Sequence, residues 1–193
     1  MEDKQNTFNQ TNGYAMQYGI ILGLWSLCGL ACYVLSFRLP ILSVLCDLLL
    51  VCSPVLAGYL TICFRRKVMI PELGFTFGRG FGFTFLMGVY ATLWIALGTY
   101  VYLAYFDNGY IFNQIENMMS RPEFVNQMRQ SGTWDLMMNE YGSVQKFVNT
   151  MRSFGASAYA GFFIYITIFT SPVVSAIVGL IAKKSPNWII PQK

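Results

Sequence analysis

The stretch ASAYAGFFIYITIFTSPVVSAIVGLIA, from Ala156 to Ala182, contains no charged residue and is followed directly by Lys183 and Lys184. About 20 consecutive apolar residues are enough for an α-helix to cross the hydrocarbon core of a bilayer. A helix also satisfies its own backbone hydrogen bonds, as any segment in lipid must. This stretch therefore predicts a transmembrane helix.

Three further stretches have the same character. They run from about Tyr18 to Phe37, from about Ile41 to Phe64 and from about Phe81 to Phe106, and Asp47 is the one charged residue that they contain. A closed β-barrel would show shorter segments of alternating character, and the first stretch is too long for the apolar part of a cleaved signal peptide. We therefore predict an all-α polytopic membrane protein, with four transmembrane helices in two hairpins of the same orientation.

The composition agrees with this fold class and limits the function. Hydrophobic residues make up 55% of the chain and charged residues 11%, whereas about 25% charged residues are usual in soluble domains. The chain has no histidine, which removes the commonest general base and transition-metal ligand. The net charge is only +4, and the basic residues stand at the ends of apolar stretches, so we expect no nucleic-acid partner. We expect no catalytic residues, cofactor or metal, and the lipid bilayer as the main partner.

All five cysteines lie in the first two apolar stretches, in or near the predicted hydrocarbon region. Disulfides form in oxidising aqueous compartments, so we interpret these residues as small apolar side chains. Metal binding is the alternative, because Cys28 and Cys32 share a helix face. However, no histidine and no further cysteine stands at a spacing typical of metal ligands. The cysteines are Cys28, Cys32, Cys46, Cys52 and Cys63.

The placement of lysine and arginine predicts the orientation, because cytoplasmic loops carry an excess of these residues. If the N-terminus is inside, basic clusters stand directly at the inner ends of the second and fourth stretches, and the outer basic residues are spread over a longer segment. We therefore expect a multi-pass protein of the inner (cytoplasmic) membrane with both termini in the cytoplasm. The inner set is Lys4, Arg65, Arg66, Lys67, Arg79, Lys183, Lys184 and Lys193, and the outer set is Arg38, Arg121, Arg129, Lys146 and Arg152.

These features divide the chain into five predicted segments. They are a polar cytoplasmic N-terminus (1–17), transmembrane spans one to three (18–106), an outer amphipathic helical segment (107–155), span four (156–182) and a cytoplasmic tail (183–193).

Three short helices are predicted in the outer segment. Ser120 and Glu123 have the spacing of a capping box at the start of the first helix, which Gly132 ends. A second helix is expected from about Thr133 and a third from about Val144, where apolar residues recur at helical spacing. The outer segment as a whole holds six of the ten methionines. We expect them to lie on the outer leaflet or to cap the bundle, and binding of a partner through methionines is the alternative.

The second and fourth spans end alike. Each contains Ser-Pro-Val, at Pro54 and Pro172, and a pair of basic residues follows at the same offset. Proline removes a backbone donor and clashes with the preceding turn, so both helices are predicted to kink there. Parallel duplication of a hairpin would explain the match, and chance is the alternative. Broken helices at matching depth also form substrate sites in transporters.

Asp47 is the candidate functional acid within the membrane. A carboxylate in the bilayer centre is costly and often marks a proton relay or cation site. The alternative is that the second helix begins at Asp47, which would place the carboxylate at the outer interface, where it would cap the helix or meet Arg38.

Small residues recur at four-residue spacing, and such faces let membrane helices approach closely. We predict helix packing at Gly19, Gly23, Gly78, Gly82, Ser171, Ser175 and Gly179, within the bundle or against a second copy or another membrane protein.

The glycine- and phenylalanine-rich stretch before the third span lacks the pattern of a phosphate-binding loop. We interpret it as an amphipathic turn at the inner interface, with Arg79 among lipid phosphates.

Three motifs carry a family resemblance. The first span begins with Tyr18 to Gly23 (YGIILG), the element Phe77 to Phe81 (FGRGF) precedes the third span, and the fourth span ends in Lys183 and Lys184. In these respects the chain resembles a family of small bacterial membrane proteins catalogued as domain of unknown function 4199, from about Tyr18 to Lys184. The resemblance implies a four-span architecture and brings no activity with it.

Three function hypotheses follow. The first is a non-enzymatic membrane protein that acts by packing, as an accessory or scaffold protein. The second is a small oligomeric transporter or channel that uses Asp47 and the kinks at Pro54 and Pro172. A membrane enzyme is the third, and it would have to rest on carboxylates alone.

Overall fold

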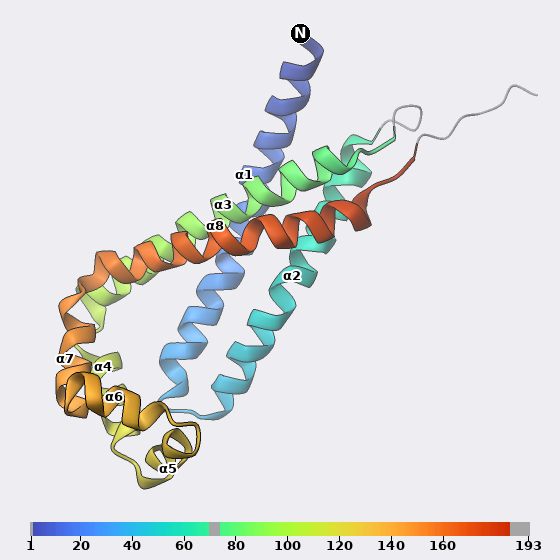
Figure 1. Ribbon diagram of the computed structural model, residues 1–193. Coiled ribbons are helices and arrows are strands. Elements are labelled where there is room, and N and C mark those ends of the chain that lie inside the picture. Colours follow the sequence, from blue (N-terminus) through green and yellow to red (C-terminus); the bar gives the residue numbers. More distant parts are fainter. Residues whose placement is uncertain (1, 70–73, 186–193) are drawn as a thin grey trace, which may run out of the picture. The chain divides into compact units, whose positions relative to one another are not determined.

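The computed structural model describes residues 2–69 and 74–185, with side chains from Thr7 onward. In these ranges the chain is helical, apart from connecting turns and one isolated β-bridge. The helices are α1 (Glu2–Ser36), α2 (Ile41–Val68), α3 (Phe77–Val101), which continues as the π-helix η1 (Tyr102–Phe106), α4 (Tyr110–Met119), α5 (Pro122–Gln130), α6 (Thr133–Tyr141), α7 (Val144–Ser153) and α8 (Gly155–Ala182) (Figure 1).

Four segments are long and apolar enough to cross a membrane: Thr7–Ser36, Ile41–Val68, Phe77–Phe106 and Gly155–Ala182. The all-α polytopic fold predicted from the sequence is thus confirmed. The first helix begins earlier than expected because residues 2–17 include no proline and only one glycine to interrupt it. The side chain of Lys4 and residues 186–193, which include Lys193 and most of the predicted tail, lie outside the described residues.

The chain forms two compact units. Unit 1 comprises Met1–Ala96 and Phe162–Lys193, and unit 2 comprises Leu97–Gly161. Unit 1 therefore contains α1, α2, most of α3 and most of α8, whereas unit 2 contains the short helices α4 to α7.

Aromatic rings from α1, α2 and α3 form the core of unit 1. The rings of Phe64 and Phe83 stack with their centroids 4.0 Å apart, and both side chains are fully buried. Tyr18 contacts Phe83 edge to face at 5.8 Å, and Phe75 contacts Phe64 in the same way at 5.9 Å. Such arrangements contribute about 0.5–1.5 kcal/mol per pair beyond the burial of area. The cluster therefore ties three helices together.

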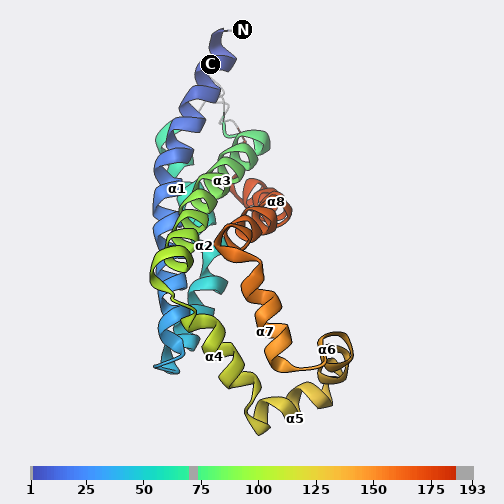
Figure 2. The same ribbon diagram turned by 90° about the vertical axis from the view of Figure 1, so that its left-hand side faces the viewer.

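The helices α1 and α2 lie side by side in both views (Figures 1 and 2). The Trp25 indole on α1 donates a hydrogen bond to the Leu49 carbonyl oxygen on α2 at 2.9 Å. Nearer the turn, the Cys46 thiol donates to the Gly29 carbonyl oxygen at 3.6 Å. The two helices are therefore held as a hairpin by polar contacts as well as by apolar packing.

Unit 2 has its own small core. Met119, Met137 and Val148, from α4, α6 and α7, are buried. Partly buried side chains surround them, among them Phe112, Ile115, Phe124, Met128, Trp134, Met138, Tyr141, Val144 and Phe147. Most of the methionines of the outer segment thus pack in the core between the helices of unit 2.

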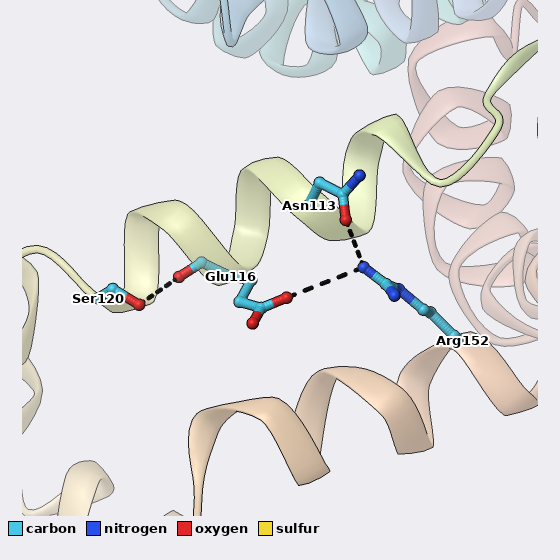
Figure 3. Close-up of polar contacts among 4 residues, drawn as sticks. All are labelled: Asn113, Glu116, Ser120 and Arg152. Atoms are coloured by element: carbon cyan, nitrogen blue, oxygen red, sulfur yellow. Dashed lines mark hydrogen bonds and ion pairs between the residues drawn. The ribbon is translucent and has the colours of Figure 1, made fainter.

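One ion pair joins α4 to α7 in unit 2. Figure 3 shows the Arg152 guanidinium between two acceptors on α4: it donates a hydrogen bond to Asn113 Oδ1, and its Nη2 lies 3.8 Å from Glu116 Oε2.

On α6, the negative charge of Glu140 raises the pKa of the neighbouring Tyr141 phenol above its ordinary value.

The predicted helix starts in unit 2 were partly right. The starts at Thr133 and Val144 are confirmed. The capping box at Ser120 is wrong: the residue before α5 is Arg121, in an extended conformation, and the Ser120 hydroxyl instead donates to the Glu116 carbonyl oxygen of the preceding helix at 2.8 Å (Figure 3). That preceding helix, α4, was not predicted.

Candidate functional site

The helices α3 and α8 meet within unit 1 through small residues. A Cβ atom added at Gly80 would lie 3.2 Å from Gly179 Cα, and one added at Gly88 would lie 2.7 Å from Ser171 Oγ. Further along, the Thr92 hydroxyl donates to Thr167 Oγ1 at 2.6 Å. We call this the small-residue face. It comprises Gly80, Gly88 and Thr92 on α3, and Thr167, Ser171 and Gly179 on α8. Thr84 and Ser175 stand in the same two rows at four-residue spacing.

The helices α3 and α8 run antiparallel, and this pairing continues beyond the start of α3 and the end of α8. Phe75 and Lys184 form an isolated antiparallel bridge, in which each backbone N–H donates to the carbonyl oxygen of the other at 2.8 and 2.9 Å. Because membrane helices gain nothing from expelling water when they associate, close backbone approach and interhelical hydrogen bonds must hold them together. The small-residue face supplies both.

Hydroxyl groups supply the buried polar contacts of this region. The Thr61 and Thr84 hydroxyl oxygens lie 2.9 Å apart, and each also lies 2.8–2.9 Å from the carbonyl oxygen one turn earlier in its own helix. Ser175 is fully buried, and its hydroxyl has no hydrogen-bond partner among the described residues. Threonine and serine thus take the place of charged groups inside unit 1.

A second close contact joins α1 to α3. A Cβ atom added at Gly19 would lie 2.5 Å from Tyr90 Cβ, and one added at Gly23 would lie 2.7 Å from Trp94 Cβ. These distances are shorter than any normal carbon–carbon contact. No larger residue fits at either position unless α1 and α3 move apart.

The predicted packing residues therefore have different surroundings. Gly19 and Gly23 lie against α3. Ser171 and Gly179 lie on the small-residue face, and Ser175 is buried in the same row of α8. Gly78 and Gly82 do not lie against another helix: a Cβ atom added at either has no heavy atom within 4 Å. The sequence reasoning missed Gly80, Thr84, Gly88, Thr92 and Thr167, because on α3 it followed the row of Gly78 and Gly82 and on neither helix accepted threonine as an equivalent small residue.

One end of unit 1 carries a group of basic residues, which we call the basic end. The Arg65 guanidinium on α2 donates to the Ala182 carbonyl oxygen at 3.0 Å, and so satisfies the C-terminus of α8. Lys67 Nζ lies 5.3 Å from the centroid of the Tyr18 ring, and Arg79 Cζ lies 5.7 Å from that of Phe64. The basic end comprises Arg65, Arg66, Lys67, Arg79, Lys183 and Lys184.

Asp47 lies on the exposed surface of unit 1. The alternative in which the second helix begins at Asp47 is wrong, because α2 begins at Ile41 after Pro40. The 28 residues of α2 extend about 42 Å, whereas the hydrocarbon core is about 30 Å thick. Asp47 is six residues, or about 9 Å, along the helix. In a centred helix it therefore lies about 3 Å inside the hydrocarbon edge.

The two proline-containing helices bury equivalent positions. Both α2 and α8 continue through their prolines, and Pro54 is exposed whereas Pro172 is partly buried. The positions three, six, seven and ten residues after the proline are buried in both helices: Ala57, Leu60, Thr61 and Phe64 in α2, and Ser175, Val178, Gly179 and Ala182 in α8. This agreement favours the parallel duplication of a hairpin. The duplication and the kinks at Pro54 and Pro172 both stay predictions. Asp47 and Pro54 lie seven residues apart on α2 and both are exposed, whereas Pro172 on α8 is partly buried.

All five cysteines are free thiols. Within residues 2–69 and 74–185, no three or more histidine, cysteine, aspartate or glutamate side chains are grouped so that they could hold a metal ion.

Four apolar helices, joined by small residues and hydroxyl contacts, define a multi-pass helical membrane protein. Comparison with known families gives a match over residues 17–184 to the family described as Protein of unknown function (DUF4199). The chain belongs to this family, as its three motifs indicated. No curated protein and no solved structure matches the chain.

Proposed function

We propose that this chain is a non-enzymatic accessory or scaffold protein of the inner membrane, which acts by packing against another membrane protein. The observation that carries the proposal is the interior of unit 1. Its buried polar side chains, among those described, are threonines and serines: Thr11, Thr61, Thr84, Thr92, Ser171 and Ser175.

Such an interior supports a packing role better than transport. Proton relays and cation sites in membranes use ionisable side chains that face the bundle interior or a water-filled cavity. In unit 1 the described interior contains hydroxyl groups that mostly satisfy helix carbonyls or one another. The interior is therefore built to hold helices together.

The contact surface that we propose is the outer face of α2 around Asp47. Carboxylates within membrane segments almost always face protein, because lipid cannot solvate them. Asp47 instead lies on the surface of unit 1, in a patch of exposed apolar side chains. A partner helix on this face would supply a hydrogen-bond donor to the Asp47 carboxylate. The patch comprises Val44, Asp47, Leu48, Val51 and Val55.

Photocrosslinking in cells tests this surface. A photoreactive amino acid replaces Val51 or Val55 in the patch, and a matched variant carries it at Phe169 or Val173 of α8, which are equally exposed. We expect one reproducible adduct from the α2 positions and only lipid adducts from the α8 positions. Adducts of equal yield from both helices, or none from α2, would contradict the proposal. An adduct with a second copy would identify the partner as the chain itself.

The transport alternative has its own readout. Asp47→Asn removes the charge and keeps the shape of the side chain. We expect that proteoliposomes containing this variant and the parent protein show the same proton and cation flux as protein-free liposomes. Flux through the parent protein that the variant lacks would replace the packing role with an oligomeric transporter.

The orientation that we propose has both termini in the cytoplasm, because the basic end gathers at the inner ends of α2 and α8. A membrane-impermeant amine reagent applied to intact cells should modify Lys146 of α7 and leave Lys67 and Lys184 unmodified. The reverse pattern would invert the topology.

A further inference from the structure

A groove lies between the N-terminal parts of α1 and α3 in unit 1. Its volume is about 280 Å³, and it is open along one side. The α1 side is formed by Thr7, Phe8 and Thr11, and the α3 side by Gly78, Arg79, Gly82 and Leu86. Because Gly78 and Gly82 have no side chain and no heavy atom near their Cβ positions, the floor of the groove is bare backbone.

The one charged side chain in this lining is Arg79, and much of its hydrogen-bonding capacity is unused. Its Nη2 donates to Gln10 Oε1 at 2.6 Å, and the guanidinium lies over the Phe64 ring. Its Nε is buried and has no hydrogen-bond partner in the described part of the chain. A guanidinium has five N–H donors in a planar fork that suits phosphate oxygens. The Arg79 side chain is thus held in place and still has N–H donors available for a ligand.

The surroundings of the groove are positively charged. The other members of the basic end lie in the same part of unit 1, and Arg65 already contacts a helix terminus. Among the side chains described in unit 1, Asp47 is the one acid, and it lies about 27 Å from Arg65 along α2. The six positive charges of the basic end attract an anion.

The groove also has the right depth for a lipid. The candidate span Phe77–Phe106 has 30 residues and extends about 45 Å, so when it is centred on a hydrocarbon core of about 30 Å its first turn, with Arg79, lies at the level of the lipid headgroups. Leu86 is seven residues further along α3, or about 10 Å deeper in the helix direction, among the acyl chains. The groove thus presents a cation at the headgroup level and an apolar, glycine-floored channel below it.

We infer that this groove binds one anionic phospholipid, with its phosphate on Arg79 and one acyl chain across Gly78 and Gly82 toward Leu86. This lipid site is separate from the α2 surface proposed for a protein partner, and each of the two proposals can be correct without the other.

Lipid titration of the purified full-length chain tests the inference. Native mass spectrometry in mild detergent measures the bound fraction with phosphatidylglycerol, and with phosphatidylcholine that has the same acyl chains. We expect Arg79→Gln to weaken phosphatidylglycerol binding about fivefold or more, since a charge near the membrane surface contributes about 1 kcal/mol and a hydrogen-bonded one contributes more. Arg66→Gln removes an exposed charge of the basic end that does not line the groove, and should change binding less than twofold. Equal losses in both variants would show diffuse attraction only and would overturn the site.

A second pair of variants tests the acyl channel without changing charge. Gly82→Leu fills the groove, whereas Gly29→Leu adds the same side chain at a position of α1 that also has no heavy atom within 4 Å. Both variants should fold, and only Gly82→Leu should lose phosphatidylglycerol. Retained binding in Gly82→Leu would overturn the inference, even if Arg79→Gln proved too unstable to assay. Competition by inorganic phosphate at the concentration of the lipid would show a site for the phosphate group alone, and would also overturn it.

Discussion

Four glycines of α3 alternate along the helix between two sets with opposite surroundings. Gly80 and Gly88 lie on the small-residue face, within contact distance of Gly179 and Ser171. Gly78 and Gly82 floor an open groove. Both sets have glycine at regular spacing, so spacing alone does not tell which set makes helix contacts. What distinguishes the packed set is a complementary row of small residues on the partner helix.

The largest difference between packed and open glycines is expected on α1. Gly19→Leu places a side chain where a Cβ atom alone would lie 2.5 Å from Tyr90 Cβ, so α1 and α3 must separate. We expect this variant to lose about 3 kcal/mol of unfolding free energy or more, measured by SDS titration in mixed micelles. Gly29→Leu on the same helix is the control, and should change the unfolding free energy by less than about 0.5 kcal/mol. Similar losses in both variants would contradict the packed contact.

A smaller effect is expected at the small-residue face. A Cβ atom added at Gly179 lies 3.0 Å from the Phe81 backbone nitrogen, which allows a shift of a few tenths of an ångström. We expect Gly179→Leu to cost about 2 kcal/mol. Gly82→Leu, on the open side of α3, should cost nothing and could gain from the better helix propensity of leucine. The same SDS titration distinguishes them, and a stable Gly179→Leu protein would place α8 elsewhere.

The smallest effect is expected from the hydroxyl contacts. Thr92→Val removes the hydrogen bond to Thr167 with little change in volume, and interhelical bonds of this kind contribute about 0.6–1.7 kcal/mol. Thr170→Val removes only a bond to the Ile166 carbonyl of its own helix, and is the matched control. A double-mutant cycle with Thr167→Val gives the coupling energy directly. A coupling energy of zero would show that the two hydroxyls do not interact in the membrane.

Four membrane helices could be predicted because long uncharged stretches have few alternatives in lipid. The starts of α6 and α7 could also be predicted, since apolar residues recur at helical spacing against a polar background. The same signal is present in α4, where Ile111, Ile115 and Met119 are spaced four residues apart, but the N-cap residue makes no side-chain hydrogen bond that would mark the start of this helix.

The contact faces of the membrane helices could not be predicted in full. In a span such as α3, nearly every side chain is apolar, so hydropathy does not distinguish the face that meets lipid from the face that meets a helix. Thr92 contributes to the packed face together with Gly80 and Gly88, whereas the Thr84 hydroxyl contacts Thr61 of α2. Which of the two rows on α3 is packed depends on the register with α8, a long-range property that no local pattern carries.

The register of α3 against α8 is tested most directly by paired cysteines in a variant without the five native ones. Thr92→Cys with Thr167→Cys places two thiols where the hydroxyls now lie 2.6 Å apart. After mild oxidation in native membranes and denaturation in SDS, this pair should be protected from a polyethylene-glycol maleimide, because a disulfide has formed. Leu93→Cys with Thr167→Cys, in which position 93 is exposed, should stay fully modifiable. Protection of the Leu93 pair, or modification of the Thr92 pair, would contradict the small-residue face as the contact that joins these helices.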